Sequence, residues 1–155
     1  MVETVFRDDQ VSQLSRHLGL SKVSVTKILV SYVNYLKEKI ESGYTVKFLN
    51  VCYLKVGGQE EPTHETLAYI ANELGRQLGY SQTVVNRVLS TYEEFLIRDL
   101  RKLYSYNVRG LLKIRLEKYN GNYRVRTKKS TVYNGMDVYI TTLGGFKRRV
   151  EVVET

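Results

Sequence analysis

Cysteine, proline and tryptophan are scarce in this chain of 155 residues, which has one cysteine, one proline and no tryptophan. The single thiol, Cys52, excludes an internal disulfide and a metal site made of several cysteines. We expect Cys52 to be a small buried apolar residue in a protein of a reducing compartment. The uncharged apolar runs are far shorter than the ~20 residues that a membrane-spanning helix needs. Membrane insertion is therefore not expected.

The first residues do not resemble a secretory signal, because Glu3, Arg7, Asp8 and Asp9 interrupt any apolar stretch there. Hydrophobic residues make up 43% of the chain and charged residues 26%. This balance is ordinary for a globular protein and argues against extended disorder. We therefore expect a folded protein that is made in the cytoplasm.

Residues suited to catalysis do not cluster in the sequence. His17 and His64 are isolated, whereas metal ligands and general bases occur in groups. The acidic pairs Asp8-Asp9 and Glu93-Glu94 are chain neighbours, which point about 100° apart on a helix and so do not face each other. The Gly-Gly pairs lack a phosphate-loop pattern. We expect no enzyme activity, no cofactor, no metal and no small-molecule substrate.

Positive charge is concentrated in the second part of the chain. The net charge is +8, from 24 basic and 16 acidic residues. Residues 1–62 contribute +1 and residues 63–155 contribute +7. Such a distribution suits nucleic acid or an acidic protein partner, although a merely solvated basic surface is the alternative. The candidate contact residues are Arg109, Lys113, Arg115, Arg124, Arg126, Lys128 and Lys129.

An internal repeat appears when the chain is shifted by 60 positions without a gap. Leu18-Gly19-Leu20-Ser21 recurs as Leu78-Gly79-Tyr80-Ser81, and the match extends through later apolar positions to Val56 and Leu116. Within each copy, apolar residues recur at spacings of three and four and then alternate, which predicts two helices followed by two short strands. Two such copies can bury their apolar faces only against each other, so we expect one intertwined unit.

Local signals place the ends of these elements. Gly19 and Gly79 are expected to end the first helix of each copy, and Ser21 and Ser81 to cap the second. Gly43 is expected to end the first long helix, and the second to run slightly further. Thr63 is expected to open the first helix of the second copy, and the two strands of each copy should turn near Asn50 and Gly110.

The tail has no counterpart in the first copy. Asn120-Gly121 and Asn134-Gly135 are signals of tight hairpin turns, and alternation around Val150 predicts a final strand. The expected organisation is a first repeat over 1–56, a linker over 57–62, a second repeat over 63–116, and a C-terminal hairpin or arm with a final strand over 117–155. The fold class is α+β, with two helix-turn-helix-plus-β-hairpin repeats and an extra C-terminal β-hairpin.

Three segments of the first copy resemble the HU/IHF family of small architectural DNA-binding proteins. These segments are Leu18-Gly19-Leu20-Ser21-Lys22, Gly43-Tyr44-Thr45-Val46-Lys47-Phe48, and Asn50-Val51-Cys52-Tyr53-Leu54-Lys55-Val56. They match the family's "T-G-L-S-K", "G-x-x-V-x-L" and "G-F-G-x-F-x-V" patterns, except that Asn50 and Cys52 replace glycines. The resemblance covers about two thirds of the chain, counting both copies. It implies a tandem HU/IHF-like pseudo-dimer formed by one chain.

The chain departs from the family in the part that bends DNA. Family members carry two long β-arms with "R-N-P-x-T-G", whose proline enters the minor groove. Here the first copy is followed directly by the linker, and the second has one shorter candidate arm, from about Leu116 to Val138, without proline. The symmetric bending device is therefore expected to be absent.

Tandem or single HU/IHF-like proteins are encoded by tailed phages, among them crAss-like phages. The resemblance thus implies a non-enzymatic virion component, such as a ring protein of the neck or tail. Its partners would be copies of itself and other virion proteins, and its location the virion. The alternative is an architectural protein that coats or bends double-stranded DNA through phosphate contacts.

Overall fold

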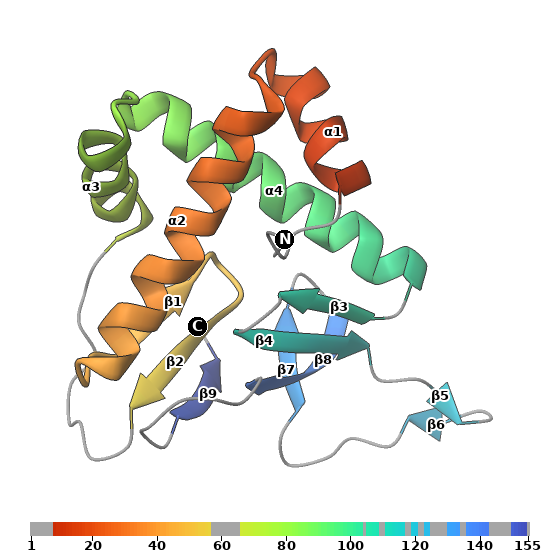
Figure 1. The fold of residues 1–155 in the computed structure, drawn as a ribbon. Coiled ribbons are helices and arrows are strands. Elements are labelled where there is room, and N and C mark those ends of the chain that lie inside the picture. Colours follow the sequence, from red (N-terminus) through yellow and green to blue (C-terminus); the bar gives the residue numbers. More distant parts are fainter. Residues whose placement is uncertain are drawn as a thin grey trace.

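The computed structural model describes a mixed α+β protein, which confirms the α+β class expected from the sequence (Figure 1). The described residues are 8–56, 66–103, 105–108, 111–116, 119–120, 123–124, 130–133, 136–142 and 150–154. Their helices are α1 (Asp8–Leu18), α2 (Lys22–Glu41), α3 (Leu67–Leu78) and α4 (Gln82–Leu103). Their strands are β1 (Val46–Phe48), β2 (Cys52–Val56), β3 (Ser105–Val108), β4 (Leu112–Leu116), β5 (Tyr119–Asn120), β6 (Tyr123–Arg124), β7 (Ser130–Tyr133), β8 (Met136–Thr142) and β9 (Val150–Glu154).

The helices and strands lie where the sequence predicts them, with small differences at the ends. Gly19 and Gly79 have φ angles of 68° and 81°, the left-handed conformation that ends a helix without a steric penalty. Ser21 and Ser81 accept hydrogen bonds from the backbone N–H of Ser24 and Val84. One expected cap is wrong: α3 is capped by Thr66, whose hydroxyl accepts from Tyr69 N–H, and not by Thr63. The predicted linker, 57–62, lies outside the described residues.

The strands of the two halves pair in the same register. We call residues 8–56 the N-terminal half and residues 66–116 the C-terminal half. In the first, Val46 lies opposite Leu54 in the β1–β2 pair. In the second, Tyr106 lies opposite Ile114 in the β3–β4 pair, which is the same pairing shifted by 60 positions. A shift of one residue would turn every buried side chain toward solvent, so burial on one face maintains this register in both halves.

The tail supplies a third strand to each of the two sheets, which the sequence analysis did not predict. Strand β8 pairs with β4, with Ile140 opposite Ile114. Strand β9 pairs with β2 in the same way, with Val152 opposite Leu54. The resulting sheets have the strand orders β1-β2-β9 and β3-β4-β8-β7. The chain therefore returns from the C-terminal half to complete the sheet of the N-terminal half.

One of the two predicted hairpin turns lies one residue further along the chain than expected. Asn120 pairs with Tyr123 in the β5–β6 ladder, so Asn120 belongs to a strand and the connection lies after it. The β7–β8 hairpin follows the prediction, because Tyr133 lies opposite Met136 and the chain reverses between them. The turn residues themselves are outside the described part of the chain.

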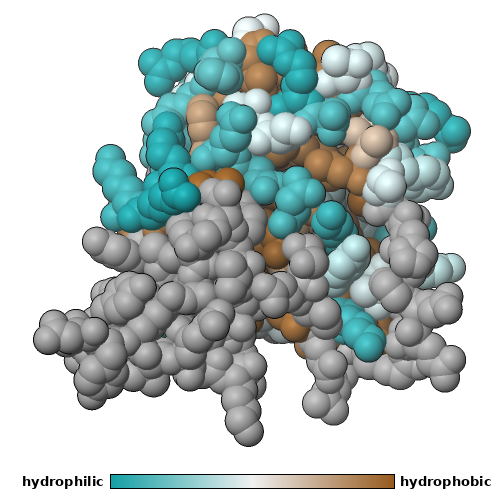
Figure 2. Space-filling model, turned by 180° about the vertical axis from the view of Figure 1, so that it is seen from behind, coloured by the Kyte–Doolittle hydropathy of each residue, from teal (hydrophilic) through white to brown (hydrophobic). Residues whose placement is uncertain are grey.

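A single hydrophobic core joins the two halves. The long helices α2 and α4 contact each other, α1 packs against both of them, and α3 does the same. The helices form one layer, and the sheets lie against its inner side (Figure 1). Ile28 and Leu36 of α2 and Val88 and Leu96 of α4 are fully buried in this core. From behind, hydrophilic side chains dominate the surface of the helical part, and apolar atoms show between them (Figure 2).

Polar contacts also connect the two halves. The backbone N–H and the side-chain amide of Asn50 both donate to Glu93 Oε1, at 3.0 and 3.3 Å. The hydroxyl of Tyr80 donates to Ser24 Oγ at 2.8 Å. Each contact joins a turn of one half to a long helix of the other.

Two tyrosines at equivalent positions of α2 and α4 bury their hydroxyl groups. Tyr32 Oη accepts from Leu49 N–H at 2.9 Å and donates to the carbonyl of Lys47 at 3.3 Å. Leu49 has a positive φ of 46°, an uncommon conformation for leucine, and this hydrogen bond stabilises it. Tyr92 Oη lies 3.0 Å from Tyr106 Oη. Desolvation by burial raises the pKa of both Tyr32 and Tyr92.

The importance of β9 can be tested by deletion of residues 150–155. We expect the free energy of unfolding to fall by at least about 3 kcal/mol, because Leu54 and Val56 lose their neighbouring strand and two valines leave the core edge. Urea unfolding followed by circular dichroism measures this change. The control is deletion of Thr155 alone, which leaves the β2–β9 ladder complete. Equal urea midpoints for the long and short deletions would contradict the role of β9.

Cys52 provides a second test of the core. Its side chain is fully buried, as expected, and desolvation raises the pKa of its thiol to about 12. The unfolded chain loses this proton near pH 9. The stability from the neutral thiol is therefore complete below about pH 9 and is lost as the pH rises toward 12.

We thus expect the free energy of unfolding to fall between pH 9 and 10, by up to about 1.4 kcal/mol per pH unit from this group. The fall should be smaller in Cys52→Ala, in which only groups such as the buried Tyr32 and Tyr92 still contribute. Urea unfolding curves at several pH values measure both slopes. If the native thiol of the wild-type protein reacts with a chromogenic disulfide reagent at pH 8 as fast as the unfolded chain does, the burial is wrong.

Candidate functional surfaces

The outward faces of the two sheets carry basic side chains. Alternation along β4 buries Leu112 and Ile114 against the core and exposes Lys113 and Arg115 on the other face. Strand β2 alternates in the same way, with Tyr53 and Lys55 half-buried at the equivalent positions. Lys47 of β1 lies beside them, its ammonium 6.0 Å from the centre of the Tyr53 ring. We call Lys47, Lys55, Lys113 and Arg115 the basic sheet face.

Only part of the predicted contact set can be located. Lys113 and Arg115 are two residues apart on one face of β4, as the alternation predicts. Arg124 lies in β6, of which the structure describes the backbone. The remaining candidates, Arg109, Arg126, Lys128 and Lys129, lie outside the described residues.

Lys47 and Lys55 were not among the predicted contact residues. The 60-residue repeat could have identified Lys55, since it is the equivalent of Arg115. Basic residues are sparser in the first copy than after residue 101, so charge density alone does not single out Lys55. The structure thus shows basic side chains at outward positions of the N-terminal half as well, on a separate sheet from Lys113 and Arg115.

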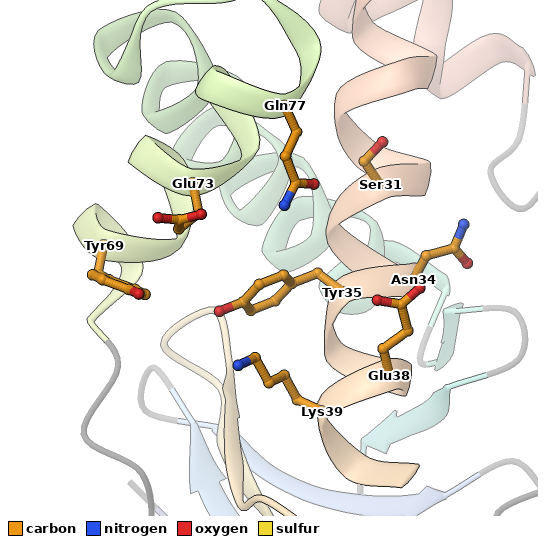
Figure 3. Close-up of a pocket in the computed structure, with 8 residues that line it drawn as sticks. All are labelled: Ser31, Asn34, Tyr35, Glu38, Lys39, Tyr69, Glu73 and Gln77. Carbon is orange, nitrogen blue, oxygen red and sulfur yellow. The ribbon is translucent and has the colours of Figure 1, made fainter. Parts of the chain in front are cut away.

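A polar groove of about 450 Å³ lies between α2 and α3. Tyr35 and Lys39 extend from α2 into the space facing α3, and Tyr69, Glu73 and Gln77 line the other side (Figure 3). The Lys39 ammonium lies 5.5 Å from the Tyr35 ring centre and 5.1 Å from that of Tyr44. Ser31, Asn34 and Glu38 complete the lining. We call this space the α2/α3 groove.

A second groove, of about 670 Å³, lies between α1 and α4. Its lining residues are Asp9, Gln13, Arg98, Asp99, Lys102 and Leu103. Arg98 donates to Gln13 Oε1 at 2.6 Å and contacts Asp99 Oδ1 at 3.4 Å, and its guanidinium stacks 4.5 Å from the Phe95 ring centre. Asp99 is buried. We call this space the α1/α4 groove.

The described residues contain no arrangement that would bind a metal ion, since no three of their His, Cys, Asp and Glu side chains come together. His17 packs edge-on against Phe95, with ring centres 5.9 Å apart. His64 lies outside the described part of the chain. None of the helices that the structure describes combines the length and the apolar character required to cross a bilayer.

Comparison with known proteins returns no relative. No family model matches the sequence, and neither a curated protein nor a solved structure is similar to it at a significant level.

Proposed function

We propose that the chain is a tandem HU/IHF-like pseudo-dimer that serves as a non-enzymatic structural protein. Three features support the pseudo-dimer. The β-hairpins of the two halves have identical registers, each hairpin gains a third strand at the same position, and α1 and α3 each pack against the long helices of both halves. These are the features expected when one chain replaces two identical subunits that share a core.

The unequal origin of the third strands favours a structural subunit over a DNA-bending protein. In the C-terminal half, the chain runs from β4 through the β5–β6 and β7 segments back to β8, so an arm can lie between them. In the N-terminal half, β2 leads into the linker, and β9 arrives from the other end of the chain. Among the described residues, only the C-terminal half has strands that could belong to such an arm, and a symmetric grip on bent DNA needs two. The fold therefore suits repeated contacts with other proteins better than it suits the bending of DNA.

The proposed setting is the virion of a tailed phage, as a ring protein of the neck or tail. Its partners there would be further copies of the chain and neighbouring virion proteins. Ring subunits meet through unlike faces, which a pseudo-dimer with two different halves can provide.

This role predicts self-association and a place in the particle. Native mass spectrometry of the full chain should show a closed oligomer at micromolar concentration. Protein mass spectrometry of purified virions of the encoding phage should detect the chain in a fixed ratio to the other tail proteins. A protein that stays monomeric and is missing from the virions would disprove the structural role.

A second function, sequence-tolerant binding of duplex DNA, is favoured by the basic sheet face. Lys113 and Arg115 of one half and Lys55 of the other lie on strands that are equivalent in the two halves. Lysine and arginine on such a face bind phosphates by counterion release, which needs no base contact and weakens as salt rises.

The double variant Lys113→Ala/Arg115→Ala tests this function in gel-shift and fluorescence assays with duplex DNA. We expect weaker binding to every sequence tested, and a slope of log K against log salt that is smaller by about 2. The control is Lys27→Ala/Arg87→Ala, which removes two exposed charges at equivalent positions of α2 and α4. If the wild-type protein does not shift DNA at low salt, or if both double variants bind equally weakly, the basic sheet face is not a DNA site.

A further inference from the structure

The two grooves occupy equivalent places in the two halves. A shift of 60 positions relates α2 to α4 and α1 to α3. It maps Glu38 and Lys39 of the α2/α3 groove onto Arg98 and Asp99 of the α1/α4 groove. It also maps Tyr69 onto Asp9 and Glu73 onto Gln13. The chain therefore presents the same surface feature twice.

The charges of the two grooves are reversed at two of these positions. Glu38 is replaced by Arg98, and Lys39 is replaced by Asp99. Glu38 and Arg98 are both exposed, so each can meet a charge from outside the molecule. A face repels a second copy of itself when it presents the same charge, but it attracts an equivalent face of opposite charge. The reversal therefore lets Glu38 in the α2/α3 groove of one copy attract Arg98 in the α1/α4 groove of another.

Some of the exposed apolar side chains lie at the same two places. Among the described residues, the exposed large hydrophobic side chains are Val23, Tyr44, Tyr69 and Leu103. Tyr69 lines the α2/α3 groove, and Leu103 lines the α1/α4 groove. Tyr44 lies beside the first groove, over the Lys39 ammonium. Apolar groups next to reversed charges are typical of protein interfaces, where the first supply affinity and the second set orientation.

We propose that the α2/α3 groove of one copy docks onto the α1/α4 groove of a second copy, head to tail, with Glu38 facing Arg98. This contact is heterologous, because each copy uses one groove on each side. Repetition of the same step gives a ring if the rotation closes and a filament if it does not. The inference rests on the proposed structural role and specifies the surface through which the copies meet.

Charge reversal on the full chain tests this contact. Sedimentation velocity at low salt should show that Glu38→Arg and Arg98→Glu each weaken self-association at least about tenfold, because each places like charges across the contact. Arg98 also contacts Gln13 and Asp99 within its own chain. The Glu38→Arg variant therefore tests the interface without altering those contacts, and far-UV circular dichroism checks the fold of both.

Two combinations then distinguish this interface from others. The double variant Glu38→Arg/Arg98→Glu should regain self-association, because the pair is restored with its charges exchanged. An equimolar mixture of the two single variants should also regain it, as alternating copies. The control Lys27→Glu, which reverses an exposed charge of α2 outside both grooves, should associate like the wild-type protein.

The possible results separate the inference from the role on which it rests. If the wild-type chain does not self-associate at any concentration, the structural role and this contact both fail. If it self-associates and the single reversals change nothing, or if neither combination restores association, the copies meet elsewhere and only this inference fails. Association of the single variants with a basic peptide or with DNA, but not with each other, would also overturn it.

Discussion

The shared burial of α2 and α4 is the constraint on which the rest of the structure depends. Each long helix has an apolar stripe that its own hairpin and short helix cannot cover. Ile28 and Leu36 of one helix and Val88 and Leu96 of the other become fully buried only in the common core. Since burial of each such side chain is worth about 1.5–3 kcal/mol, neither half is expected to be stable alone. The short helices α1 and α3 each pack against both long helices, and β9 pairs with β2, so these elements help to keep the two stripes together.

The exchange of the last strand makes the two halves depend on each other in a second way. Strand β9 is separated from β2 by nearly a hundred residues, yet it satisfies the backbone groups along one edge of β2. An unpaired edge beside a hydrophobic strand is a site of aggregation. The pairing of β9 with β2 covers such an edge in the N-terminal half. The same pairing occupies the free edge of β2, so the N-terminal half reaches a three-stranded sheet with a strand from the end of the chain.

The two halves have kept their cores alike and their surfaces different. Tyr32 and Tyr92 are equivalent and equally buried, whereas Glu38 and Arg98 are equivalent and opposite in charge. A core position must fit its neighbours, which are nearly the same in both halves, and close packing penalises change. An exposed position is free of that constraint. The reversed charges at the grooves are the basis of the contact proposed between copies, and the cationic positions found in both sheets are the basis of the proposed binding of DNA.

The sequence alone determined the local elements of this protein. Periodicity placed the helices and hairpins, glycine and serine placed their ends at Gly19, Ser21, Gly79 and Ser81, and alternation identified Lys113 and Arg115 as outward-facing. These features depend on residues within a few positions of one another. Only the tertiary structure decided which strand completes each sheet, that Lys55 joins the basic sheet face, and that two grooves with reversed charges form at all. Such features join residues far apart in the chain, and backbone pairing between β9 and β2 leaves no local pattern in either segment.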